Sequence, residues 1–187
     1  MAVLVIAGSE RGAGKTAVGC ALMAALPELR WVAVKISPHL HRDEAVWEEL
    51  DPKSDKDTGR YLAAGADQAF LISDSPDSAT SILDALRLVP RSGSLLVESN
   101  RVTGKTMAMV DEPVVSLAVL TGTGSDWKAS LSARLDTADA LVLTGGLTCE
   151  ELPVELQMKP VFRLIEGQWS SPELLRFVHL RLLPVND

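Results

Sequence analysis

The sequence predicts an α/β protein of three layers, with a mostly parallel central sheet flanked by helices. Strand-like and helix-like segments alternate nearly end to end, which is typical of parallel sheets. The first strand-like run is apolar without alternation, as expected for a strand that is covered on both faces. A glycine-rich turn joins this run to the first helix. A chain of 187 residues that is 47% hydrophobic and 23% charged fits a single domain over residues 1–187.

The first hundred residues contain four of the expected strands. Residues 3–6 are aliphatic and β-branched, which predicts a buried strand, and residues 17–26 are apolar and favour a helix. The segments that follow are predicted as a strand at 31–36, a long polar loop at 37–55, a short helix at 56–64, a strand at 69–72, a helix at 78–88 with helical spacing of its leucines, and a buried strand at 94–98.

The second half repeats this rhythm. We expect a strand at 114–120, a helix at 125–135, a strand at 140–143 and a short edge strand at 161–164. The last helix covers 172–183, because a proline is tolerated in the first turn and the serines before it can cap the helix. The carboxyl ends of the parallel strands should meet at one edge of the sheet, where ligands bind in open α/β folds.

The composition excludes several classes of function. A formal charge of −7 and a pI near 5.0 argue against broad binding to nucleic acids or anionic membranes. No apolar run approaches the length of a membrane span, and no basic leader precedes the first apolar stretch. Cys20 and Cys149 are too few for a disulfide framework or a zinc site. We therefore expect a cytoplasmic protein with reduced thiols.

The turn after the first strand has the features of a phosphate-binding loop. Glycines let successive backbone N–H groups and the positive end of the next helix surround a phosphate. The lysine would reach the terminal phosphates, and the threonine hydroxyl would bind Mg²⁺. Ser9 stands where the strict motif has glycine, and Gly8 lies one place too early. The motif predicts a P-loop NTPase fold, with the nucleotide bound by Gly12, Ala13, Gly14, Lys15, Thr16 and Ala17.

Acidic residues at the same edge could complete a magnesium site. Glu98 ends an otherwise apolar strand, where a carboxylate is costly to bury unless it serves a cation or a hydrogen-bond network. The alternative for Glu98 is a solvated strand end. Asp57 begins a predicted helix, where the helix dipole alone would also favour it. We predict Thr16, Asp57 and Glu98 as metal ligands, and Lys15, Asp57 and Glu98 as the catalytic residues.

Several cations and histidines lie beside this edge. Lys35 interrupts an apolar strand and needs a partner, such as a phosphate or a substrate carboxylate, or else an exit to solvent. His39 and His41 are a weak metal signal, and we interpret them as solvated or substrate-facing. Arg101 and Lys105 are either contacts for an anionic substrate or surface charges of a loop.

An ordered series of segments resembles the molybdopterin-guanine dinucleotide biosynthesis protein B family, within the P-loop class that includes dethiobiotin synthetase. After the P-loop, residues 32–36 are similar to that family's Val-x-Val-Ile-Lys-His segment. Residues 56–67, Lys-Asp-Thr-Gly-Arg followed by Ala-Gly-Ala-Asp, are the most specific part. Residues 95–98 are similar to its Val-Glu-Gly strand end, although Ser99 replaces the glycine. The resemblance covers roughly the first hundred residues.

The resemblance implies a GTP-binding, Mg²⁺-dependent accessory protein that helps attach a guanine nucleotide to molybdopterin. It also implies a homodimer and a protein partner in molybdenum cofactor assembly. By the same resemblance, Lys15 and Thr16 serve the phosphates and Mg²⁺, and Asp57 and Glu98 face the metal.

Two alternatives follow from the residues. The Asn-Lys-x-Asp motif of many guanine-specific P-loop proteins is replaced by Thr-Gly-Gly-Leu at 144–147, so the chain leaves GTP against ATP open. The relation to dethiobiotin synthetase favours an ATP-dependent enzyme that activates a small carboxylate. The irregular start of the loop would fit a degenerate nucleotide-binding scaffold. Nothing in the sequence is an obvious strong base for activating water, so any GTPase or ATPase activity should be slow.

Overall fold

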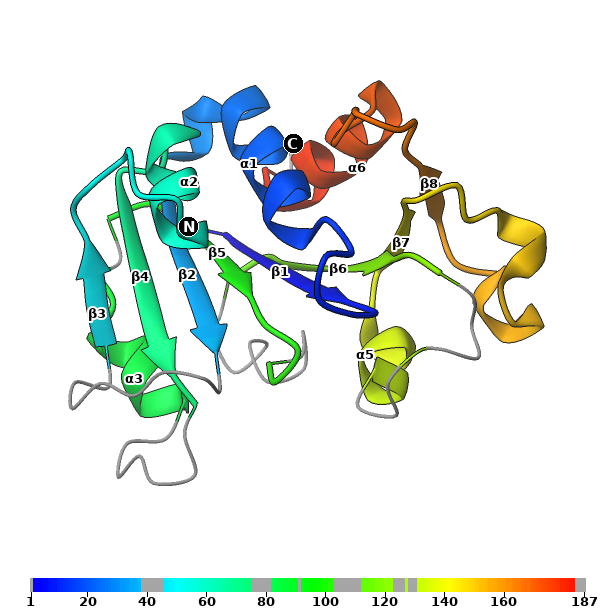
Figure 1. Ribbon diagram of the computed structural model, residues 1–187, viewed down its shortest axis with the longest axis horizontal. Helices are drawn as coiled ribbons and strands as arrows, with labels where there is room; N and C mark the ends of the chain where they lie inside the picture. Colours follow the sequence, from blue (N-terminus) through cyan, green and yellow to red (C-terminus); the bar gives the residue numbers. More distant parts are fainter. Residues whose placement is uncertain are drawn as a thin grey trace.

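The computed structural model describes residues 2–37, 46–74, 82–90, 92–102, 112–122, 127 and 131–183. Within them, eight strands form one sheet in the order β3-β4-β2-β5-β1-β6-β7-β8 (Figure 1). All neighbouring strands pair in parallel except β3, which is antiparallel to β4. This arrangement confirms the predicted α/β fold with a mostly parallel central sheet.

The strands are β1 (Val3–Gly8), β2 (Trp31–Ser37), β3 (Val46–Glu49), β4 (Gln68–Ser73), β5 (Ser94–Glu98), β6 (Val114–Leu120), β7 (Ala140–Leu143) and β8 (Val161–Arg163). The α-helices in the described ranges are α1 (Lys15–Ala25), α2 (Asp57–Ala63), α3 (Ile82–Leu88), α5 (Ser132–Thr137) and α6 (Pro172–Leu182). Short 3₁₀ turns lie at Pro27–Leu29, Cys149–Glu151 and Val154–Leu156. No described helix is long and apolar enough to cross a membrane.

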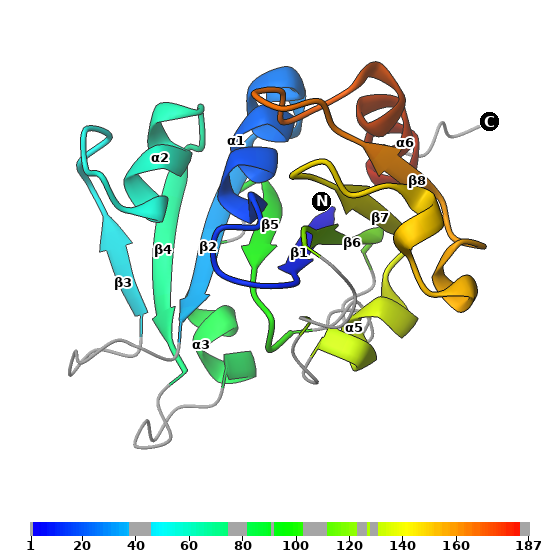
Figure 2. The ribbon, with the colours of Figure 1, turned by 45° about the vertical axis from the view of Figure 1, so that its right-hand side comes forward.

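Helices cover both faces of the sheet. Helices α1, α2 and α6 lie on one face, and α3 and α5 lie on the other; Figure 2, turned by 45°, shows the same separation. Val18 and Leu22 of α1 pack with Leu174 and Val178 of α6 in one buried cluster. On the opposite face, apolar side chains of the central strands pack against α3 in a second cluster. The central strands are therefore buried on both sides, which explains their continuous apolar sequence.

The segment expected as a polar loop at 37–55 contains a strand instead, so that expectation was wrong for its second half. β3 pairs with β4 from Val46↔Ile72 to Glu49↔Ala69 and forms one edge of the sheet. Edge strands need only one buried face and commonly carry charged residues. Glu48 is accordingly exposed, whereas Glu49 is buried and accepts hydrogen bonds from the Asp51 N–H and the Thr58 hydroxyl.

The helix boundaries agree with the predictions within a few residues where the structure describes them. α6 begins after Ser171, whose hydroxyl accepts a hydrogen bond from the Leu174 N–H at 3.2 Å, as expected of a helix cap. α1 begins at Lys15, two residues earlier than expected, directly after Gly14. The first parts of the helices predicted at 78–88 and 125–135 lie largely outside the described residues, as do His39, His41 and Lys105.

Candidate nucleotide and metal site

The glycine-rich loop connects β1 to α1 at the carboxyl edge of the sheet. Gly14 has a left-handed backbone with φ of 94°, a conformation that favours glycine. A Cβ atom at Gly14 would also lie 2.5 Å from Cζ3 of Trp169. Glycine is therefore required here for two reasons: the backbone conformation, and the Trp169 indole that lies directly against the backbone. The loop therefore keeps its N–H groups near the start of α1, where a phosphate can be bound.

Lys15 folds back over the beginning of the loop. Its Nζ donates a hydrogen bond of 2.7 Å to the Glu10 carbonyl, and a Cβ atom at Gly8 would lie 2.7 Å from its Cγ. Gly8 lies one place before the glycine position of the strict motif, and the aliphatic part of the Lys15 side chain passes directly over it. This position brings the ammonium group to the loop that would hold the phosphates.

Ser9, which replaces the motif glycine, is fully buried and connects the loop to the end of β6. Its hydroxyl accepts a hydrogen bond from the Thr121 N–H at 3.1 Å. The Thr144 hydroxyl, at the end of β7, donates to the Ala13 carbonyl at 3.0 Å. The loop is therefore hydrogen-bonded to two neighbouring strand ends, through the Thr121 backbone and the Thr144 side chain, and the departure from the strict motif has a structural reason.

Asn100 makes a third connection, which sequence reasoning did not find. Its side-chain oxygen accepts from the Gly8 N–H and its amide nitrogen donates to the Gly8 carbonyl, both at 2.9 Å. The residue before it, Ser99, accepts hydrogen bonds from the backbone N–H groups of Arg101 and Val102 and so shapes this turn. The only sign of this connection in the sequence is that a polar residue, Asn100, follows Glu98 by two positions.

Glu98 is the centre of the predicted metal site. The side chain is 1% exposed, and its Oε2 accepts a hydrogen bond from the Thr16 hydroxyl at 2.8 Å. The Tyr61 hydroxyl donates to the same oxygen, and the Lys35 ammonium donates to Oε1. The structure thus brings together Thr16, Glu98 and Lys35 from three different elements, as the position of Glu98 at the end of an apolar strand had indicated.

Lys35 and Glu98 face each other across two neighbouring strands. They are direct partners in the parallel register of β2 and β5. Lys35 also forms an ion pair with Asp57 at the start of α2, with 2.9 Å between Nζ and Oδ2. Arg60 lies 3.6 Å from the other Asp57 oxygen. Both predicted carboxylates therefore meet at one ammonium group, next to the first turn of α1.

The protonation of this cluster follows from its charges. Burial alone would lower the pKa of Lys35, but the charge and hydrogen bond of Glu98 outweigh it and raise that pKa. Burial would likewise raise the pKa of Asp57, yet its hydrogen bond to Lys35 and the lysine charge hold that pKa below its usual value. Burial and the negative charge of Glu98 raise the pKa of Tyr61 well above its usual value. The cluster keeps charged Lys35 and Asp57 with a neutral tyrosine at neutral pH.

Tyr61 is a functional candidate that the sequence analysis did not identify. It is completely buried and lies four residues after Asp57 on α2, so both side chains are on the same face of the helix. That spacing was the available signal. Arg101, by contrast, forms an ion pair with the half-buried Asp74 at 3.1 Å, and does not belong to this cluster.

The donor atoms suit a magnesium ion. The hydroxyl of Thr16 and the carboxylates of Asp57 and Glu98 are hard oxygen ligands, which Mg²⁺ prefers, usually together with phosphate oxygens and water. The place between the two carboxylates already holds a positive charge, the Lys35 ammonium. Among the described residues, no group of three or more His, Cys, Asp or Glu side chains gathers as a metal site, so here the third protein ligand would be the Thr16 hydroxyl.

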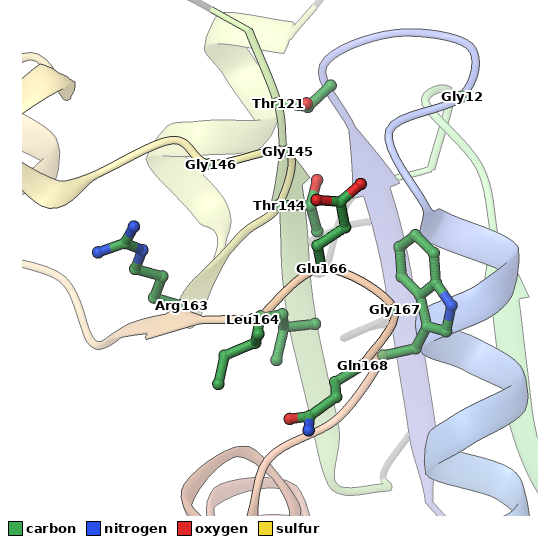
Figure 3. Close-up of a pocket in the computed structure, with 12 residues that line it drawn as sticks. Gly12, Thr121, Thr144, Gly145, Gly146, Arg163, Leu164, Glu166, Gly167 and Gln168 are labelled. Carbon is green, nitrogen blue, oxygen red and sulfur yellow. The ribbon is translucent and has the colours of Figure 1, made fainter.

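A cavity of about 850 Å³ lies beside the loop (Figure 3). It lies between the ends of β6 and β7 and the segment 164–169 that follows β8, and it includes Gly12 of the phosphate loop. Its volume falls within the range of roughly 300–1,000 Å³ that is typical of small-molecule sites. The Glu166 side chain points from its loop into this space, and Arg163 lies at the other end of the lining (Figure 3).

The sequence at residues 144–147, Thr-Gly-Gly-Leu, gave no indication of this cavity. A Cβ atom at Gly145 would lie 2.4 Å from the Thr121 hydroxyl oxygen, and Gly145 has φ of 62°. This glycine allows the turn after β7 to approach the end of β6 closely. Gly145 and Gly146 thus form part of the cavity wall, at the place where many guanine-specific P-loop proteins carry the Asn-Lys-x-Asp motif.

Several solved structures of other proteins share this fold. No family model and no curated protein match the sequence. A MobB protein homolog from Bacillus stearothermophilus has a TM-score of 0.51 at 16% identity, over 97% of this chain and 98% of that chain. MobB from Bacillus subtilis has a TM-score of 0.52 at 16% identity, over 98% and 99%. LpxK from Aquifex aeolicus, solved with ATP, has a TM-score of 0.51 at 19% identity, over 87% of this chain and 53% of that chain.

These likenesses confirm that the chain shares the fold of the MobB structures, as the resemblance of its segments had predicted. At identities of 16% to 19%, the shared property is the fold.

Proposed function

We propose that the protein binds Mg²⁺ and a nucleoside triphosphate, with GTP favoured, and acts as an accessory protein in the assembly of the molybdopterin guanine dinucleotide cofactor. The observation that carries this proposal is the contact between the phosphate loop and the carboxylates. The Thr16 hydroxyl, which would bind the metal, is hydrogen-bonded to Glu98 at 2.8 Å, and Glu98 and Asp57 meet at one cation.

Each group has a defined role in this proposal. The N–H groups of residues 12–17 would surround the phosphates, and Lys15 would neutralise the terminal one. Thr16, Asp57 and Glu98 would hold Mg²⁺, which supplies positive charge to the phosphate oxygens when bound. The carboxylates are engaged by cations and hydroxyl donors, so they suit the holding of a metal better than the removal of a proton from water. Hydrolysis would then be slow and proceed by positioning and electrostatic stabilisation.

The cavity next to Gly12 supports a place for the nucleoside. Trp169, which lies against Gly14, offers an aromatic surface, and Glu166 offers a carboxylate inside the cavity. A carboxylate can accept hydrogen bonds from both N–H donors on the Watson–Crick edge of guanine, whereas adenine offers one amino group and an acceptor. This chemistry favours GTP without the Asn-Lys-x-Asp motif.

The role in molybdenum cofactor assembly has a different support. The motifs at residues 32–36, 56–67 and 95–98 resemble the protein B family, for which MobB is the short name, and two MobB structures share the fold over nearly the whole chain. By the same resemblance we propose a cytoplasmic homodimer that works with a protein partner of the assembly. The mass in solution, measured by light scattering, tests the dimer.

An ATP-dependent enzyme that activates a small carboxylate is the second candidate. It is favoured by the similarity to LpxK, a protein solved with ATP. The two candidates differ in selectivity and in turnover: the enzyme would prefer ATP and form ADP only with its substrate.

The first test is calorimetric titration of the protein with GTP and with ATP in the presence of Mg²⁺, repeated on Lys15→Ala. We expect tighter binding of GTP, and a loss of about 100-fold in affinity in the variant, because charge-assisted hydrogen bonds to phosphate contribute roughly 1.5–3 kcal/mol each. Leu180→Ala, an exposed residue of α6, is the control.

Preference for ATP would move the assignment to the second candidate. Binding of neither nucleotide, or equal binding in Lys15→Ala, would identify the loop as a degenerate scaffold.

A further inference from the structure

The ammonium group of Lys35 occupies the position between the two carboxylates that would hold the metal. We infer that Lys35 and the divalent cation compete for these carboxylates, so that tight metal binding requires the phosphates of the nucleotide to draw Lys35 away. This inference rests on the proposed function, because it concerns the same metal site. It makes Lys35 an internal cation that couples metal binding to nucleotide binding.

The contacts are specific to the oxygens that a metal would use. Lys35 Nζ lies 2.9 Å from Asp57 Oδ2 and also contacts Glu98 Oε1, while Glu98 Oε2 accepts from Thr16 at 2.8 Å. A Mg²⁺ ion needs oxygen ligands at roughly 2.0–2.1 Å, so an ion bound to the same two carboxylate oxygens would overlap the ammonium group. One of the two cations must leave.

Burial makes this exclusion strong. Glu98 is 1% exposed and the Lys35 side chain 19% exposed, so little water can screen two positive charges at this place. A buried carboxylate without a cation would be equally costly. The site therefore favours one cation at a time, and Lys35, which is part of the chain, is always available to fill it.

Lys35 has a route to the phosphates. It is the fifth residue of β2, near the carboxyl end of that strand, and its long flexible side chain remains partly exposed. The phosphate loop begins on the same edge of the sheet, and Thr16 contacts the same glutamate as Lys35. A triphosphate would offer the ammonium group a new anionic partner as the metal takes its place. By thermodynamic linkage, metal and nucleotide would then strengthen each other's binding.

The test measures metal binding alone, in protein without nucleotide. Mn²⁺ serves as the probe because the signal of the free ion is read directly by electron paramagnetic resonance. We expect weak binding by the wild type and a dissociation constant at least tenfold lower in Lys35→Met. Arg60→Met is the matched control: it removes one positive charge near Asp57, but Arg60 is 48% exposed and lies 3.6 Å from the carboxylate. The control should change the constant by less than twofold.

Three results would overturn the inference. The first is equal Mn²⁺ affinity in the wild type and Lys35→Met. The second is an equal gain in Arg60→Met, which would show a general effect of net charge. The third is a gain in Lys35→Met that survives the further change Glu98→Gln, which would place the metal elsewhere. If Lys35→Met fails to fold, Lys35→Gln replaces it, since the amide can still donate to one carboxylate.

The outcome is separable from the proposed function. If the wild type binds Mg²⁺ and GTP together but Lys35→Met gains no Mn²⁺ affinity, the competition is wrong and the nucleotide site stands. If the wild type binds no nucleotide, the proposed function fails whatever Mn²⁺ does.

Discussion

The phosphate side and the cavity side of the site are built differently. On the phosphate side, Glu98 is almost fully buried and is contacted by Thr16, Lys35 and Tyr61. On the cavity side, Glu166 and Trp169 belong to a loop that is largely exposed, and Trp169 is 40% exposed. The buried charges on the phosphate side satisfy one another, whereas the side chains on the cavity side remain available to a ligand. Changes on the first side should therefore affect stability, and changes on the second should affect affinity.

The largest effect is expected from Glu98→Ala. The change leaves Lys35 with one carboxylate fewer and removes the acceptor of the buried Tyr61 and Thr16 hydroxyls. Breaking a buried ion pair by removing one partner costs roughly 3–5 kcal/mol. Urea unfolding measures the loss, with the exposed Glu48→Ala as control, for which we expect a change within about 0.5 kcal/mol. A loss below about 1 kcal/mol for Glu98→Ala would remove the proposed difference between the two sides.

An intermediate effect, on affinity alone, is expected from Trp169→Ala. Stacking of a base on an aromatic side chain contributes roughly 1–3 kcal/mol, so the nucleotide should bind about tenfold more weakly or worse. Stability should change little, because the indole is partly exposed. Calorimetric titration and urea unfolding are measured on the same samples, with Met158→Ala, 88% exposed and outside the cavity lining, as control. Lost stability with unchanged affinity would show that Trp169 only supports the loop.

The smallest effect is the pH dependence that Asp57 brings to stability. Despite burial, its hydrogen bond to Lys35 and the lysine charge hold its pKa below the usual value in the folded protein. Asp57 therefore stabilises the fold above its unfolded pKa of about 3.9, and this contribution is lost as the pH falls through the lower folded value. The carboxylate is 38% exposed, so the contribution should stay below about 1 kcal/mol.

The measurement is the difference in unfolding free energy between the wild type and Asp57→Asn from pH 7 down to pH 3. The difference should be constant near neutral pH and shrink in the acid range. Asp84→Asn, on an exposed position of α3, controls for the loss of a surface aspartate. A difference that grows in acid would contradict the direction of the pKa shift.

Most of the sheet could be predicted from the sequence because its strands are buried on both faces and read as apolar runs. β3 was missed because an edge strand with two glutamates lacks this signature. On the phosphate side, Lys35 was expected to meet a phosphate, a substrate carboxylate or solvent, and its partners are Asp57 and Glu98 instead. Thr16, Asp57 and Glu98 could be predicted to lie close together, because each carries an oxygen ligand at the start of a helix or the end of a strand. These are local signals that one segment carries by itself.

The rest of the site depends on contacts between distant segments. Asn100 acts through Gly8, 92 positions away, and Thr144 through Ala13, 131 positions away. Neither residue is unusual in its own segment. The cavity has the same origin, since the segments that follow four strands, β1, β6, β7 and β8, form its walls. Sequence spacing predicts what one element does, but these roles arise only when the order of the strands is known.

The paired hydrogen bonds between Asn100 and the backbone of Gly8 affect the entropy cost of binding a ligand at this site. Asn100 lies two residues after Glu98, so the turn that follows the proposed metal ligand is hydrogen-bonded to the last residue of β1, directly before the phosphate loop. These two hydrogen bonds fix the start of the loop relative to the strand end that carries Glu98. For a nucleotide bound as proposed, the conformational entropy of ordering these two segments would already be lost on folding, and binding would not have to supply it.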